Sequence, residues 1–168
     1  NEWQEIYATA IKAENLANTD PGTTCFHARR TLELAVNWIY RFDEELTQPY
    51  DNQLSTKLLD NSFKDNTPPG VFTKMIFIKN IGNKAVHSNK VISTTDAVQT
   101  VRELFHILYW MARSYTQGDA SQFDGVEFVE ANVPGRQVSI PVNTFNQLKA
   151  VYEDTKAKAA EEAEEQKQ

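Results

Sequence analysis

The sequence is short of residues that build covalent and metal frameworks. Its single cysteine, Cys25, lies among apolar residues at helical spacing, so a disulfide framework is excluded and we expect a buried thiol in a reducing, cytoplasmic setting. Its three histidines, His27, His87 and His106, fall on three different predicted helices, and none has carboxylates at ligand spacing. Because a zinc site gathers three or four such side chains, we expect no metal site.

Glycine is also scarce, which bears on nucleotide and nuclease chemistry. Six glycines are spread along 168 residues, and no glycine-rich loop ending in Lys-Ser or Lys-Thr can be assembled from them.

A two-metal nuclease needs clustered carboxylates with a lysine on neighbouring strands. Asp124 and Glu127 lie in a strand-like segment, but no lysine follows them at a useful position. We therefore expect this chain to hold no cofactor and not to hydrolyse ATP.

Long hydrophobic runs are missing as well. The longest strongly apolar run, residues 104–112, is far shorter than the roughly 20 residues that a membrane helix needs, so we expect no membrane association. The chain begins at Asn1 instead of a methionine, without a signal-like segment, and it ends in KAKAAEEAEEQKQ, a strong helix former whose apolar side has run out. We expect both ends to continue in a longer protein.

What is present points to one helical domain with an extension. The chain is 40% hydrophobic and 11% aromatic, which predicts a packed core, and its net charge of -6 restricts any nucleic-acid contact to a local surface. Apolar residues recur at three-and-four spacing over most of its length. This pattern predicts an all-α bundle of four to five long helices, over residues 2–18, 21–45, 68–87, 94–115 and from 143 onward.

The character of the sequence changes near Gly125. Apolar and polar residues alternate around Pro134-Gly135, and the apolar positions are Val126, Phe128, Val138, Ile140 and Val142. A period of two predicts a small β-hairpin. The expected organisation is thus a helical bundle over residues 1–122, a hairpin-like connection over 123–142, and a C-terminal helix over 143–168 that leads to a downstream domain.

A basic island lies in the third long helix and just after it. No Asp or Glu occurs between Asn66 and Thr95, whereas the lysines there are Lys74, Lys79, Lys84 and Lys90. These lysines are candidates for contacts with DNA phosphates, and the alternative is an ordinary solvated surface.

The same helix contains Gly82, Asn83 and His87. Glycine in a helix interior costs about 1 kcal/mol relative to alanine, so Gly82 predicts a close crossing of two helices. Asn83 and His87 are four residues apart and can touch. They suit either proton transfer or a structural hydrogen bond, and spacing alone favours the structural role.

The fourth long helix carries polar and aromatic side chains opposite its main apolar stripe, namely Arg102, His106, Trp110 and Arg113. Trp and Arg often anchor interfaces, so this side is a candidate docking surface. The alternative is that His106 and Trp110 pack under a neighbouring helix.

Three stretches carry a family resemblance: HARRTLELAVNWIY, IKNIGNKAVHS and VRELFHILYWMARSY. Together they resemble the N-terminal domain of the restriction (R) subunits of type I restriction-modification enzymes, which is HEPN-like. The resemblance implies a parent protein that uses ATP and Mg²⁺ to translocate and cleave unmodified foreign DNA in phage defence, together with modification and specificity subunits. It implies that this piece is a non-catalytic scaffold or docking module.

The wider HEPN group includes RNases with an Arg-Asn-x-x-x-His motif. Asn83 and His87 match that motif, but Gly82 occupies the position of its arginine, and Lys79 or Lys84 would have to replace it. The alternative function is therefore a metal-independent RNase centred on Asn83 and His87. A third alternative is a homo-oligomerisation module, because helical bundles of this kind often pair.

Overall fold

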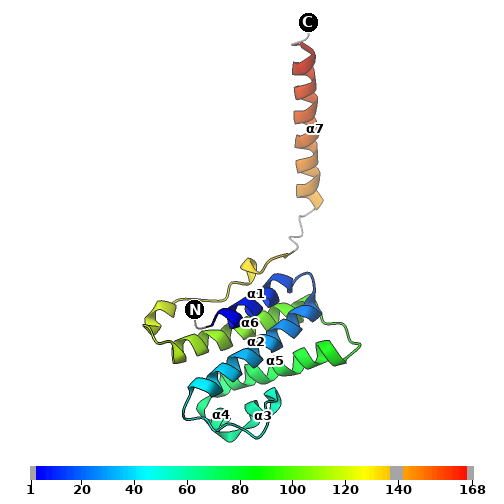
Figure 1. Cartoon of the computed structure of the whole chain (residues 1–168). Helices are drawn as coiled ribbons and strands as arrows, with labels where there is room; N and C mark the ends of the chain where they lie inside the picture. The colour runs from blue at the N-terminus through cyan, green and yellow to red at the C-terminus, as the bar shows by residue number, and fades with distance from the viewer. Residues whose placement is uncertain (1–2, 137–141, 166–168) are drawn as a thin grey trace. The chain divides into compact units, whose positions relative to one another are not determined.

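The computed structural model describes residues 3–136 and 142–165, and every regular element in these ranges is helical. The all-α prediction is confirmed. The α-helices are α1 (Gln4–Leu16), α2 (Pro21–Phe42), α3 (Leu54–Leu59), α4 (Asn61–Asn66), α5 (Pro69–His87), α6 (Thr94–Tyr115) and α7 (Val142–Glu165). Two short 3-10 helices, η1 (Ala120–Phe123) and η2 (Glu130–Asn132), follow α6 (Figure 1).

The two longest helices of the bundle begin where the sequence signals predict. Asp20 caps α2 by accepting a hydrogen bond from the backbone N–H of Thr23 at 3.2 Å, and Pro21 occupies the first turn. Ser93 caps α6 in the same way, with its hydroxyl 3.0 Å from the backbone nitrogen of Asp96. Both caps satisfy amide groups that a helix start otherwise leaves free.

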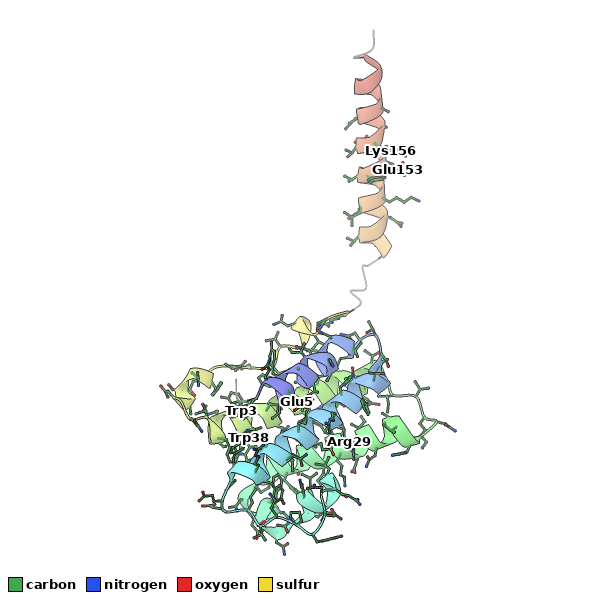
Figure 2. All side chains as sticks on the ribbon, in the orientation of Figure 1. Trp3, Glu5, Arg29, Trp38, Glu153 and Lys156 are labelled. Carbon is green, nitrogen blue, oxygen red and sulfur yellow. The ribbon has the colours of Figure 1, made fainter. Side chains whose placement is uncertain are left out.

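The core lies between four helices that pack side by side, α1, α2, α5 and α6 (Figure 1). Helix α2 contacts the other three and runs antiparallel to α5. Its apolar stripe is buried against those of α5 and α6, and the most enclosed core residues are Leu32, Val36, Ile39, Met75, Ile78 and Ile107. Trp3 and Trp38 close one end of the α1–α2 pair with an edge-to-face contact at 5.6 Å between ring centroids (Figure 2).

The short helices α3 and α4 cover the end of the bundle where α2 finishes. Phe63 of α4 is 1% exposed and stacks on Tyr40 of α2 at 5.5 Å between centroids. The Tyr40 hydroxyl donates to the carbonyl of Lys57 at 2.6 Å, and the buried Lys57 ammonium donates to the side-chain oxygen of Asn37 at 2.6 Å. These bonds satisfy polar groups that the packing encloses.

The expected hairpin is absent from the residues that the structure describes. Val126 and Phe128 lie in an irregular segment that follows α6, and η2 forms where the first strand would continue. The second expected strand lies mostly outside the described residues, and Val142 begins α7 instead.

The apolar residues of this segment pack on helices, with no partner strand in the described ranges. Phe128 contacts the ring of Phe105 at 5.9 Å, and Val133 is 2% exposed in a cluster with Ala17 and Val101. Phe128 and Val133 therefore anchor this irregular segment on the bundle, whereas Val126 remains 47% exposed.

The chain divides into two units, residues 1–136 and 137–168. The second contains α7, on which Leu148, Val151 and Tyr152 are all more than half exposed and Lys158 pairs with Asp154 at 2.8 Å. Among the helices of the described ranges, none has the length and apolar character needed to cross a membrane.

Candidate functional site

Helices α2 and α5 approach each other closely at Gly82. A Cβ atom built on Gly82 would lie 2.5 Å from the Cβ of Arg29 and 2.8 Å from its Cδ, distances that real side chains do not tolerate. The aliphatic stem of Arg29 therefore lies over the glycine, in the space that a side chain would fill. Figure 2 shows Arg29 on α2, beside α5. Absence of a side chain at position 82 is what lets the two helices meet at this point.

The guanidinium of Arg29 has no acceptor among the described residues. Its Nε atom is enclosed and makes no hydrogen bond. The nearest carboxylate along α2, Glu33, is 3.4 Å from Nη1 of Arg30. An enclosed donor without a partner costs free energy. Because Nε itself is sealed from solvent, an external acceptor would have to meet the terminal Nη groups of Arg29.

Two exposed apolar side chains lie near this crossing. Phe26 is 48% exposed and precedes Arg29 by three residues on α2, and Val86 is 53% exposed and follows Gly82 by four on α5. Because the helices are antiparallel, both lie at the same end of the crossing (Figure 1). Lys79, three residues before Gly82, lies at the other end. We call the surface formed by Phe26, Arg29, Lys79 and Val86 the α2–α5 edge.

The structure separates the four lysines of the basic island. Lys74 forms an ion pair with Glu103 of α6 and is half-buried, so its charge is already paired within the chain. Lys79 and Lys84 are five residues apart, which places them about 140° apart around α5. Lys84 and Lys90 are exposed, and neither they nor Lys79 form an ion pair within the described ranges. The four lysines therefore do not form one tight patch.

Asn83 and His87 lie in the last two turns of α5. Asn83 is half-buried and His87, the last residue of α5, is exposed. In the described part of the chain no hydrogen bond joins them. Both are accessible from solvent on the α5 side of the crossing.

The candidate docking side of α6 is partly covered by the segment that follows this helix. Arg102 donates to Glu130 and, at 2.8 Å, to Gln99, while Arg113 donates to Asp124 at 2.6 Å. Both arginines therefore hold the strap, residues 119–133, against α6.

His106 and Trp110 are engaged too. Nδ1 of His106 is enclosed and lies 3.7 Å from an oxygen of Glu103, and Trp110 packs against the main core with its ring edge-to-face with Tyr115 at 5.9 Å. Trp110 is thus half-buried against the core, whereas the side chain of His106 remains 41% exposed, so this side of α6 is covered only in part.

Sequence reasoning missed the polar cluster around Glu103. This carboxylate, whose side chain is 13% exposed, accepts hydrogen bonds from Lys74 of α5 and Gln99 of α6. The spacing of four between Gln99 and Glu103 was the only local signal, because Lys74 comes from another helix. The cluster ties α5 to α6 and faces a shallow depression of about 450 Å³.

The strap also covers an apolar pocket of about 260 Å³ that no sequence signal indicated. Its walls come from α1, α6 and residues 123–128, with Glu14 as the single charged lining residue.

Cys25 is fully buried elsewhere, with its sulfur 3.6 Å from the Thr100 hydroxyl, and burial raises the pKa of its thiol. The described residues contain no group of three or more His, Cys, Asp or Glu side chains that could hold a metal ion.

Comparison with known proteins gives one match. Residues 12–134 match a family described as a domain of unknown function (DUF4145), and this range includes the Gly82–Arg29 crossing and the whole strap. No curated protein and no solved structure matches the chain. The matched range covers well over half of the sequence, and the chain therefore belongs to the DUF4145 family.

Proposed function

We propose that this chain is a non-catalytic docking module that holds DNA for a larger enzyme, in the position of the N-terminal domain of a type I restriction R subunit. One observation carries the proposal. Four cations have no carboxylate partner among the described residues: Arg29 at the crossing of α2 with α5, Lys79 and Lys84 on α5, and Lys90 in the loop that follows α5. Other basic residues, such as Lys74, Arg102 and Arg113, are paired. Unpaired cations attract phosphates, and counterion release supplies most of the affinity.

The larger context rests on the resemblance of IKNIGNKAVHS and the flanking helices to R-subunit N-terminal domains. In that context ATP and Mg²⁺ serve the parent protein, and modification and specificity subunits are its partners. The reading frame after Gln168 tests this: nuclease carboxylates followed by helicase motifs support the parent assignment, and a stop codon opposes it.

DNA binding is testable with the 168-residue chain and a labelled duplex of about 30 base pairs. Fluorescence anisotropy over a salt series measures how steeply affinity depends on salt, and each phosphate that the protein neutralises adds about 0.9 to that slope. Replacing Lys79, Lys84 and Lys90 together by alanine should lower the slope by roughly two to three and weaken binding at low salt.

The matched control removes the same charge elsewhere. Lys149, Lys156 and Lys158 are exposed on α7, and their triple alanine variant should bind as the unmodified chain does. Equal weakening in the two triple variants, or no binding at low salt, would refute the proposal.

One observation favours the RNase alternative as a second candidate. Gly82 stands where the RNase motif has arginine, and the stem of Arg29 from α2 fills that space. The stem of Arg29 thus lies against the turn of α5 that carries Asn83. Incubating the chain with single-stranded RNA and a chelator separates the two functions: cleavage that is abolished by His87→Ala would establish the RNase, and intact RNA would favour docking.

A further inference from the structure

The enclosed state of Arg29 distinguishes it from most arginines of the described ranges. Arg30, Arg102 and Arg113 each lie within ion-pair distance of a carboxylate, and Arg41 is exposed with its guanidinium over the ring of Phe42. Arg29 is half-buried, its Nε is enclosed, and no acceptor within the described ranges contacts it. The fold therefore holds a charged donor group in place and gives it nothing to bind.

The geometry of the crossing also fixes the direction of this side chain. The Cβ, Cγ and Cδ atoms of Arg29 all lie within 3.0 Å of the position that a Gly82 Cβ would take. A long side chain normally loses rotamer entropy when it is held in one conformation. Here the helix packing has already imposed that loss. Binding of a ligand to the guanidinium therefore costs little further rotamer entropy.

Two further donors follow from the position of Gly82 on α5. Lys79 lies one turn before the glycine and adds a charge, while Asn83 is next to the glycine and is half-buried without a side-chain hydrogen bond in the described ranges. The guanidinium is planar and matches the oxygens of a phosphate with two parallel hydrogen bonds, which an ammonium group cannot do.

We propose that Arg29 is a phosphate clamp, in which the guanidinium binds one phosphate of a nucleic-acid backbone and Lys79 and Asn83 complete the site. The clamp deepens the DNA-holding function proposed above and rests on it for the source of the phosphate. In this arrangement Gly82 is required because any side chain there displaces the arginine stem from the site.

The Nε–H resonance of Arg29 in ¹H–¹⁵N spectra of the 168-residue chain tests the clamp directly. Adding inorganic phosphate, and separately a short DNA duplex, should shift the Arg29 Nε–H signal and leave the Arg41 Nε–H signal in place. Sodium chloride at equal ionic strength should not shift either signal. A shift with phosphate but not with duplex would assign the site to free phosphate, and no shift with either would overturn the clamp.

Arg29→Lys keeps the charge and removes the two-pronged donor. Phosphate and duplex affinity should fall by about tenfold, because a bidentate charged contact is worth more than a point charge. Glu33→Gln removes the nearest carboxylate on α2 and should strengthen binding. The melting temperature of each variant shows whether the bundle is intact, and unchanged affinity in a folded Arg29→Lys variant would overturn the clamp.

The clamp and the proposed function fail in different ways. If Arg29→Lys leaves duplex affinity unchanged while the Lys79, Lys84 and Lys90 triple variant binds duplex weakly, the clamp is wrong and the DNA-holding function stands. If phosphate shifts Arg29 but the chain binds no duplex at any salt concentration, the clamp stands as an anion site and the DNA-holding function is wrong.

Discussion

Gly82 shows how a missing side chain sets the distance between two helices. Alanine is a better helix former by about 1 kcal/mol, so helix propensity alone predicts that Gly82→Ala stabilises the chain. The new Cβ would however lie 2.5 Å from the Cβ of Arg29, and that atom cannot move without its backbone. Overpacking of this kind costs about 1–3 kcal/mol. We therefore expect Gly82→Ala to lower the free energy of unfolding by a net amount of up to about 2 kcal/mol, measured by urea denaturation.

The matched control for this substitution is Gly70→Ala. Gly70 lies in the first turn of the same helix, and a Cβ there would meet nothing within 4 Å. Its replacement should be neutral or slightly stabilising. Trimming Arg29 to alanine should not rescue Gly82→Ala, because the clashing Cβ remains. If the two glycine substitutions gave the same result, the close approach of α2 and α5 would not be real.

Local signals predict several single positions but not their partners. Gly82 stands out because a helical pattern contains a glycine, and Asp20 and Ser93 because caps have a sequence signature. Arg29 could not be connected to Gly82, because the two are far apart in sequence and nothing local links them. Likewise, Arg102 and Arg113 form ion pairs with carboxylates of the strap. The sequence of the strap is typical of a hairpin, so no local signal predicts these pairs.

At the level of elements, the cap of α6 should carry a measurable part of the stability. The Ser93 hydroxyl accepts a hydrogen bond from the backbone of Asp96 at 3.0 Å. We expect Ser93→Ala to reduce the free energy of unfolding by about 1 kcal/mol. Thr95→Ala, at an exposed position two residues later, is the control and should have little effect on the denaturation midpoint.

Two ion pairs should keep the strap ordered but contribute little to the stability of the bundle. Arg102 binds Glu130 and Arg113 binds Asp124, and all four side chains are at least one-third exposed. Exposed pairs contribute about 0–1 kcal/mol each, so replacing both arginines by alanine should change the melting temperature only slightly. Limited proteolysis should nonetheless cut residues 119–131 faster than in an Arg30→Ala control. Equal cleavage rates would show that the apolar contacts of the strap hold it alone.

The whole bundle should lose stability in alkali because of two tyrosines, the buried Tyr40 and the half-buried Tyr115. Burial and the nearby Asp60 raise the pKa of Tyr40 to about 12, and burial together with a 2.7 Å hydrogen bond to Asp43 raises the pKa of Tyr115. The folded state thus favours both neutral hydroxyls more than the unfolded state does. Their contribution is complete below pH of about 10, the ordinary tyrosine pKa, and declines as pH rises toward 12.

This pH dependence can be assigned by substitution. Tyr115→Phe should lower the free energy of unfolding by about 1 kcal/mol at neutral pH, because the hydrogen bond to Asp43 is removed, and should flatten its decline between about pH 9 and 11.5. Tyr50 is 92% exposed, so Tyr50→Phe should leave both the neutral value and the slope unchanged. Because Cys25 also has a raised pKa, a Cys25→Ala background separates the thiol from the tyrosines. A slope that survives in Tyr40→Phe/Tyr115→Phe would assign the alkaline loss to groups other than the two hydroxyls that close the end of the bundle.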